Sequence, residues 1–344
     1  MTQALKMTID MPAYEAARRL LLAYLDEIRI QAPLALDADP ARSAEAVHDL
    51  RVALRRSLTV LDSYAPWLNA ESTRAARKGY RKLLKPLGEL RDLDVLAEQA
   101  GECRTESAVS SSDLISLLGQ ERDKKRSRLP ELLDGRDFQD WLSQRGRDLS
   151  AAQAALNMAL PAITGRGKVQ MHRLQECLPV MLYSAAANLT VYHSILRSPA
   201  GFPETIRLSQ AEEREVSEVS DVVLHRLRIF SKQFRYLLEM HQTTLGPSAR
   251  QMIQEFKRYQ DLLGNWHDAV QAVAYLSRRQ NLIGKDSCAF WQEHWQQSRS
   301  ALQSEFLSLW PELTAAWFHQ RISASLDYAA NSSDGTCACA RSGL

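Results

Sequence analysis

Apolar residues recur along this chain at the three- and four-residue spacing of an amphipathic helix. In the first such segment, from about Pro12 to Ile30, the apolar side carries Leu20, Leu21, Tyr24, Leu25 and Ile28. Strand-like alternation of Val, Ile and Thr is hard to find, whereas Leu, Ala, Arg, Glu and Gln dominate long stretches. The pattern predicts an all-α fold.

Helix-breaking and helix-capping residues divide this pattern into separate elements. We expect Pro33 to end the first helix, Ser43 to cap a helix that reaches about Tyr64, and Ser72 to cap the next one. Pro86 is expected to kink or break that third helix. After a loop at residues 101–113, we expect a short helix to residue 129, a helix at 138–160 and a helix at 169–196. A loop with the acidic run 212–215 should follow. The remaining expected helices are one with His225, one that begins at Pro247, and two at 285–309 and 311–329.

A histidine followed by basic residues occurs twice, and the two copies begin at His48 and His225, 177 residues apart. In both copies the residues at offsets +3 and +7 are cations. At about 100° per residue these positions share one face of a helix with the histidine. The cations at the two offsets are Arg51, Arg55, Arg228 and Lys232. The sequence therefore predicts two positively charged helical stripes.

A second motif, Leu-Gly-x-x-(Arg/His)-Asp, follows each stripe at nearly the same distance. Gly88 lies 40 residues after His48, and Gly264 lies 39 residues after His225. Two motifs that repeat in register indicate an internal duplication. We therefore expect two small helical bundles at about residues 12–160 and 169–325, followed by a disordered tail at residues 330–344.

Positive charge is concentrated near these motifs, although the whole chain has a net charge of only +2. Residues 71–91 carry seven cations against two acids, and residues 225–258 carry the same numbers. Like charges at i,i+4 on a helix repel by about 0.2–0.5 kcal/mol per pair, so a polyvalent anion is the natural compensator. Three cations without counterparts in the second copy are expected to be ordinary solvated surface: Arg74, Arg77 and Lys78.

The two histidines allow two interpretations. Asp92 and Asp268 repeat in register with His48 and His225, and each could be the partner of its histidine. Such a carboxylate could hold the imidazole protonated and add a cation to the site, or the pair could lock two helices together. We favour the helix-packing role.

Composition narrows the class of protein. The chain of 344 residues has 45% hydrophobic and 24% charged residues, which is ordinary for a soluble globular protein. The most apolar stretch, residues 180–192, is interrupted by polar residues and is expected to be a core helix rather than a membrane span. Five cysteines make no disulfide framework, and the N-terminus lacks a secretory signal. We expect a cytoplasmic location with reduced thiols, no membrane, and no metal or cofactor.

At the repeated positions the chain resembles the CHAD proteins, a family named for a histidine-bearing α-helical domain. The resemblance rests on the two basic stripes and the two Leu-Gly segments, and it extends over about residues 12–325. It implies a duplicated helical bundle with pseudo-two-fold symmetry, whose basic residues line a central cavity that binds inorganic polyphosphate. The residues to which the resemblance extends this role are His48, Arg51, Arg55, Arg56, Arg81, Lys82, Lys85, Arg91, His225, Arg228, Lys232, Arg235, Lys257, Arg258 and His267.

The resemblance also implies a role without catalysis, either in recruitment to polyphosphate granules or as an accessory to polyphosphate metabolism. CHAD segments occur fused to triphosphate-hydrolysing tunnel domains that carry Glu-x-Glu-x-Lys. The nearest approach in this chain, Glu213-Arg-Glu215-Val-Ser, lacks the lysine. The sequence therefore favours a binding protein over an enzyme.

Two alternatives stay open. A protein that binds RNA or single-stranded nucleic acid needs stacking aromatic residues near its cations. A metal-dependent phosphohydrolase needs clustered carboxylates, and Asp92 and Asp268 alone are too few. The aromatic residues near the basic stretches form a scattered set: Tyr80, Tyr236, Tyr259 and Trp266.

Overall fold

The structure is a computed structural model, and it confirms the all-α fold class. Nearly all regular structure in the described residues is α-helical; the exceptions are one short 3-10 helix and one two-stranded hairpin. The described residues are 7–102, 112–150, 154, 158, 161–164, 168–197, 210–310 and 313–333. They form two compact units, and the chain passes between them more than once. Unit 1 contains residues 12–172 and 268–298. Unit 2 contains residues 173–267, the residues from 299 onward and a short N-terminal segment that ends at Met11.

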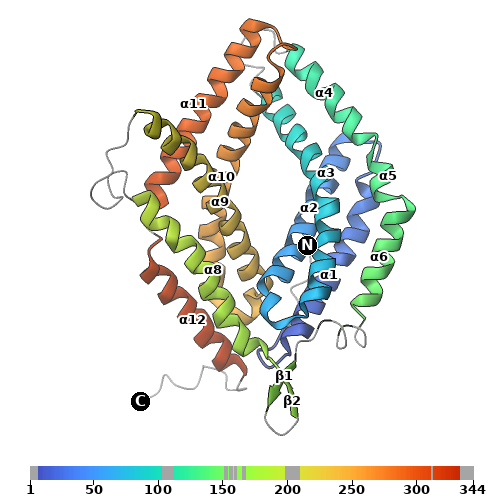
Figure 1. The fold of residues 1–344 in the computed structure, drawn as a ribbon, viewed down its shortest axis with the longest axis vertical. Helices are drawn as coiled ribbons and strands as arrows, with labels where there is room; N and C mark the ends of the chain where they lie inside the picture. The colour runs from blue at the N-terminus through green and yellow to red at the C-terminus, as the bar shows by residue number, and fades with distance from the viewer. Residues whose placement is uncertain are drawn as a thin grey trace. The chain divides into compact units, whose positions relative to one another are not determined.

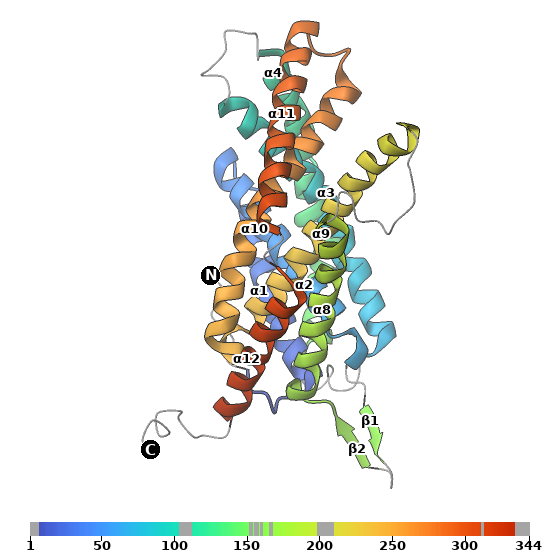
Figure 2. The same cartoon turned by 90° about the vertical axis from the view of Figure 1, so that its left-hand side faces the viewer.

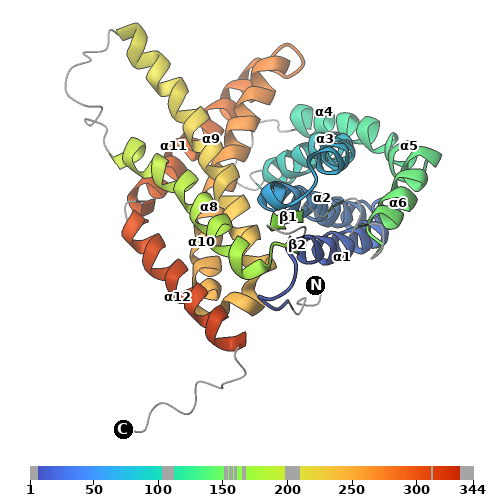
Figure 3. The same cartoon turned by 60° about the horizontal axis from the view of Figure 1, so that its bottom comes forward.

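Unit 1 is built around three long consecutive helices. α1 packs along α2, α2 along α3, and α3 along α4 (Figures 1 and 3). The shorter helices α5 and α6 then run back alongside α3 and α1 (Figure 1). The helices are α1 (Ala13–Leu34), α2 (Pro40–Ser63), the 3-10 helix η1 (Ala65–Trp67), α3 (Ala70–Glu102), α4 (Ser112–Arg126), α5 (Leu129–Leu133) and α6 (Arg136–Asp148).

Unit 2 contains most of the C-terminal helices and shares two of them with unit 1. α8 packs against both α9 and α12, and α8 and α12 lie side by side in Figures 1 and 2. The chain passes from unit 2 to unit 1 within α10 and returns within α11. The helices are α8 (Leu174–Arg197), α9 (Gln210–Met240), α10 (Gln242–Arg279), α11 (Lys285–Leu309) and α12 (Ala315–Ser333).

Each unit has its own apolar core. In unit 1, Leu93 and Leu96 of α3 pack with Leu118 of α4 and with Trp291 and Trp295 of α11. In unit 2, the rings of Phe234, Phe256 and Phe318 lie within 6 Å of one another, with centroid distances of 4.9, 5.5 and 5.9 Å. Full burial of such side chains contributes about 1.5–3 kcal/mol each, so packing between helices stabilises both units.

The caps of two helices differ from the prediction. The helix with His48 begins at Pro40, and the Asp39 carboxylate accepts a hydrogen bond from the Ala41 amide at 2.9 Å. Ser43 does not cap it, because its buried hydroxyl donates to the Ala35 carbonyl at 2.7 Å. Proline at the first helical position needs no amide partner, which explains why the helix starts earlier.

The third helix also starts and continues differently. The Asn69 side chain, not Ser72, caps α3 by accepting hydrogen bonds from the amides of Glu71 and Ser72 at 3.0 and 3.1 Å. α3 is unbroken through Pro86, so the prediction of a break there was wrong. Pro33 lies in the last turn of α1, one residue before the helix ends at Leu34, so the predicted end of this helix is confirmed to within one residue.

The segment between the two predicted halves differs most. α6 ends at Asp148, so the single helix expected at residues 138–160 is interrupted. Strands β1 (Pro161–Thr164) and β2 (Lys168–Met171) then pair antiparallel and are the two arrows in Figure 2. Two strands of four residues are too short for a reliable period-two signal. Residues 165–167, between the two predicted halves, lie outside the described residues.

Other element boundaries shift by a few residues. The backbone of residues 213–215 is helical within α9, so the loop expected there was wrong. α12 continues through Ser333, into the expected tail, and residues 334–344 lie outside the described residues. α11 spans the predicted residues 285–309.

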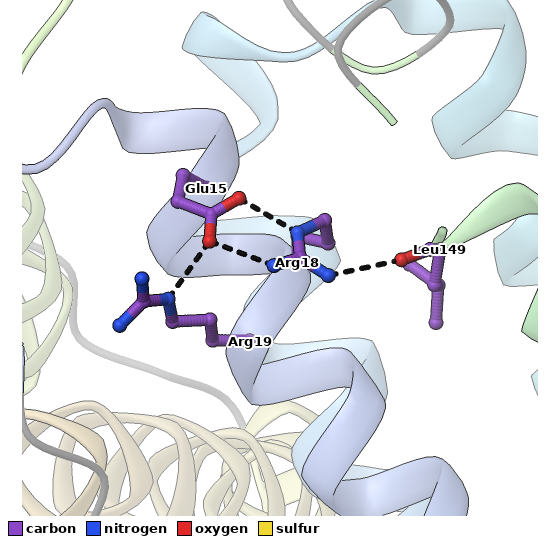
Figure 4. A network of polar contacts seen from close by, with 4 residues as sticks. All are labelled: Glu15, Arg18, Arg19 and Leu149. Atoms are coloured by element: carbon purple, nitrogen blue, oxygen red, sulfur yellow. Dashed lines mark hydrogen bonds and ion pairs between the residues drawn. The ribbon is translucent and has the colours of Figure 1, made fainter. Parts of the chain in front are cut away.

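A polar network ties the start of α1 to the end of α6 (Figure 4). The Glu15 carboxylate accepts hydrogen bonds from Arg18 Nε at 2.6 Å and from Arg19 Nε at 2.8 Å. Arg18 Nη1 also donates to the Leu149 carbonyl at 3.2 Å. The hydrogen bonds from Arg18 and Arg19 hold the pKa of Glu15 below its usual value, although its partial burial acts in the opposite direction. Arg18 thereby gives a partner to a carbonyl at the end of α6, where the last carbonyls of a helix have no partner within the helix.

Gly246 divides α10 into two helical segments. Its φ of 73° lies in the left-handed region, and a Cβ there would lie 2.3 Å from Cδ1 of Tyr328 on α12. Pro247 opens the longer second segment, as the sequence predicted. Only glycine fits both the backbone angle and the close approach of the tyrosine ring.

His241, between α9 and α10, makes the stability of the fold sensitive to acid. The ring is completely buried, and burial lowers its pKa from 6.5 to about 3. Above pH 6.5 the ring is neutral in both folded and unfolded protein. Between pH 6.5 and 3 only the unfolded chain takes up this proton, so the free energy of unfolding falls by about 2 kcal/mol at pH 5.

We expect His241→Gln to remove this pH dependence. Urea denaturation of both proteins at pH 7.5 and pH 5 checks the prediction. The loss of stability between the two pH values should be about 2 kcal/mol smaller in the variant, whatever the substitution does at pH 7.5. Equal losses in both proteins would contradict it.

Candidate functional site

The basic stripe of α2 faces the glycine-bearing part of α3 in unit 1. The side chain of Arg51 is only 13% exposed, and its Nη2 lies 3.9 Å from Asp92 Oδ1. A Cβ built on Gly88 would lie 3.9 Å from the same Nη2. The first two repeated motifs are therefore in contact, with the guanidinium of Arg51 beside the glycine.

On α3 itself, four site positions form one line along the helix. At about 100° per residue, Arg81, Lys85, Gly88 and Asp92 fall within about 60° of arc. Arg81 and Lys85 are exposed, and Gly88 is half-buried. These residues therefore form a cationic surface strip with a glycine between its cations and Asp92.

Lys82 lies on a different side of α3. It lines a cavity of about 780 Å³ between α3 and α4–α6, together with Glu131, Asp140 and Trp141. Four basic and four acidic side chains line this cavity: Lys82, Lys125, Arg128, Arg136, Glu89, Glu131, Asp137 and Asp140. Because its charges balance, the cavity lacks the cationic character of the strip on α3.

The remaining predicted residues of unit 1 vary in burial. His48 is exposed, whereas Arg55 and Arg91 are half-buried. Arg56 is also half-buried, and its Nε atom is fully buried. Asp92 forms an ion pair with Arg51, and its pairing with His48 stays a prediction.

In unit 2 the structure brings two predicted histidines together. The rings of His225 on α9 and His267 on α10 lie 4.9 Å apart and are tilted by 33°. Two turns further along α9, the Ser231 carbonyl accepts a hydrogen bond from Gln260 Nε2 of α10 at 2.7 Å. These two contacts fix the register of α9 against α10 and place Arg228 and Gly264 at the same level between them.

The other predicted cations of unit 2 lie along the same two helices. Lys232 is half-buried, and the Nε atom of Arg228 is fully buried, as is that of Arg51 in unit 1. Arg235 pairs with Glu239 at 3.2 Å, and its guanidinium lies 5.3 Å from the centre of the Tyr236 ring. Lys257 and Arg258 are exposed.

Arginines that join helices elsewhere have tight carboxylate partners. Arg279 and Glu121 form two hydrogen bonds of 2.6 and 2.9 Å, and Arg299 and Asp221 form two of 2.7 and 2.6 Å. By contrast, the Arg51–Asp92 distance of 3.9 Å exceeds hydrogen-bond length. Within the described part of the chain, seven predicted site cations form no ion pair: Arg55, Arg81, Lys82, Lys85, Arg91, Lys257 and Arg258.

The cations expected to be ordinary surface behave in two ways. Arg74 and Lys78 are exposed. Arg77 is half-buried, pairs with Asp62 at 2.7 Å and donates to the Leu61 carbonyl at 2.8 Å, so it connects α3 to α2. Its role is structural rather than that of a solvated side chain.

The comparison with protein families decides the classification. The family model described as CHAD domain matches residues 16–277, which is most of the chain. The chain belongs to the CHAD domain family. The CHAD domain limits predicted from the sequence, residues 12 and 325, stay a prediction, as does the central cavity.

Solved structures show the same CHAD fold at low sequence identity. The crystal structure of the CHAD domain from the plant Ricinus communis has a TM-score of 0.59 and 20% identity, and the match covers 95% of each chain. PptA from Streptomyces chartreusis has a TM-score of 0.54 and 17% identity, and the match covers 87% of this chain and 99% of that one. No curated protein sequence matches this chain.

Two negative findings apply to the described residues of this CHAD protein. None of their helices is long and apolar enough to cross a membrane. No group of three or more His, Cys, Asp or Glu side chains among them is arranged to hold a metal ion.

Sequence reasoning missed the contacts that organise the CHAD site. It named Asp92 as a candidate partner of His48, which stays a prediction, and it did not foresee the ion pair of Asp92 with Arg51, one helical turn further along α2. It did not foresee that the rings of His225 and His267 lie in contact. The spacing within the repeated motif contains a signal for such contacts. His267 follows Gly264 by three residues and therefore lies about one turn further along the same face of its helix.

Proposed function

We propose that this protein binds inorganic polyphosphate without catalysis, through the repeated cations of its two units. The CHAD family to which it belongs is known to bind polyphosphate. The observation that supports the proposal is that the helices carrying the two repeated motifs contact each other in both units, through Arg51 and Asp92 in unit 1 and through His225 and His267 in unit 2. A structural role alone gives no reason to repeat this arrangement.

The chemistry of the side chains suits such a ligand. Polyphosphate carries about one negative charge per phosphate unit, and arginine meets phosphate oxygens with two charge-assisted hydrogen bonds. The partly buried guanidinium of Arg51 is held in place by packing, so it loses little conformational freedom on binding. The exposed cations Arg81, Lys85, Lys257 and Arg258 add point charges along the same helices.

A nucleic-acid ligand is less consistent with the arrangement. The four aromatic residues near the basic stretches are at most 6% exposed, so their faces are not available for stacking on bases. Their rings belong to the cores; Tyr80, for example, packs edge-on against Trp141 with centroids 5.3 Å apart.

Binding without catalysis also agrees with the carboxylates of the site. Asp92 lies beside Arg51, and no group of three or more His, Cys, Asp or Glu side chains among the described residues is arranged to hold a metal ion. We place the action of the protein in the cytoplasm, at polyphosphate granules or as an accessory to polyphosphate metabolism.

Calorimetric titration with a long-chain polyphosphate of defined length tests the proposal. We expect saturable binding that a single-stranded RNA with the same number of phosphates does not displace, and that orthophosphate displaces only at far higher concentration. A phosphate-release assay with Mg²⁺ or Mn²⁺ should give no product. Displacement by RNA at equal phosphate concentration would favour the nucleic-acid alternative, and phosphate release would show a hydrolase.

A further inference from the structure

The two motif glycines stand in helix interiors without a structural need for glycine. Gly88 lies within α3 and Gly264 within α10, and both have helical backbones, because the positive φ recorded among the described glycines is at Gly246. Glycine inside a helix is less stable than alanine. Glycine at these two positions therefore does not stabilise the helix that contains it.

Packing does not require glycine at these positions either. A Cβ on Gly264 would meet no atom of the described residues within 4 Å. A Cβ on Gly88 would meet only Arg51 Nη2, at 3.9 Å, which is ordinary van der Waals contact. Gly79 of α3 shows the opposite case, because a Cβ there would lie 2.4 Å from Trp141 Nε1.

Both glycines nevertheless have the same types of residue at matching positions along their helices. Seven residues before each glycine on its helix stands a cation, Arg81 or Lys257, and four residues after it stands an aspartate. On the preceding helix, Arg51 lies beside Gly88. Arg228 lies at the level of Gly264, between the His225–His267 and Ser231–Gln260 contacts. Each glycine thus leaves a bare strip of helix backbone at the level of the cation at offset +3 of its stripe.

We infer that Gly88 and Gly264 are the points at which the bound phosphate chain passes directly over the helix backbone. This inference rests on the proposed binding of polyphosphate. A phosphate unit held by Arg51 or Arg228 occupies the space that a Cβ would fill, and so approaches the helix more closely than any side chain permits. The glycines thereby select an unsubstituted phosphate chain over a nucleic acid, whose sugar and base on every phosphate are too bulky for this approach.

Alanine substitutions test the inference because stability and affinity should move in opposite directions. In Gly88→Ala and Gly264→Ala we expect the melting temperature to rise by about 1 °C each, since alanine is the better helix former. The affinity for a long-chain polyphosphate should fall at least about tenfold in each variant. Gly88→Leu and Gly264→Leu should weaken binding further, because the loss follows the size of the side chain.

Gly119 of α4 provides the matched control. It lies in a helix interior, is half-buried, and a Cβ there would meet no atom of the described residues within 4 Å, but no candidate cation is recorded beside it. Gly119→Ala should raise the melting temperature by a similar amount and leave the affinity for polyphosphate unchanged.

The outcomes separate this inference from the proposed function. If the unmodified protein binds polyphosphate and the alanine variants bind equally well, the inference is wrong and the proposed function stands. A lower melting temperature in Gly88→Ala or Gly264→Ala would assign the glycine to packing and would also overturn the inference. If the unmodified protein does not bind polyphosphate, both fail together.

Discussion

Replacing Arg51 and Arg228 together by glutamate should abolish the binding of polyphosphate. The two arginines hold equivalent positions in the two basic stripes; Arg51 lies beside Gly88, and Arg228 lies at the level of Gly264. Charge reversal removes a charge-assisted contact and adds repulsion against the ligand, so we expect the affinity to fall by about a thousandfold or more. Titration calorimetry of the double variant with the same polyphosphate measures the loss.

The matched control for this variant is the pair Arg74→Glu and Lys78→Glu. Both side chains are exposed on α3, and their reversal changes the net charge by the same amount. We expect this control to lose affinity only slightly, since screened surface charges contribute little at physiological salt. Circular dichroism and melting temperature should show that both variants are folded. Equal losses in the two variants would mean that net charge, rather than the proposed site, governs binding.

Local signals in the sequence predicted the helices well where breakers are unambiguous. α11 spans the predicted residues 285–309, and Pro247 opens the long segment of α10 after the left-handed Gly246. The start of α2 was placed wrongly, because several polar residues near it could act as the cap. Tertiary contact decides between them: Ser43 is buried and donates to Ala35 instead of capping.

For the candidate site, too, the sequence predicted local features but not the contacts between helices. The repeated offsets from His48 and His225 predicted which cations share a helix face, because the geometry of a single helix fixes that relation. They did not predict that Lys82 faces a charge-balanced cavity while Arg81, its neighbour, does not. They also did not predict the ion pair between Arg51 and Asp92. Contacts between helices depend on how the helices pack, and a single sequence does not determine that packing by its local patterns.

The affinity for polyphosphate should fall steeply with salt concentration. If about six to ten cations neutralise phosphate units, each contact releases a counterion, and the slope of log affinity against log salt should be about −0.7 per contact. Raising the salt from about 50 to 200 mM should then weaken binding by about three hundredfold to ten-thousandfold. Titrations at four or five salt concentrations measure the slope.

Single substitutions then identify which cations take part. Replacement of Arg55 or Arg81 by alanine should make the slope shallower by about 0.7, because one phosphate contact is lost. Replacement of Lys124, an exposed residue of α4 outside the repeated stripes, should leave the slope unchanged. This pattern distinguishes contact cations from those that act through the general field of the protein, whose removal lowers affinity without a unit change in slope. A slope near zero in all variants would show that the repeated cations do not bind a polyanion.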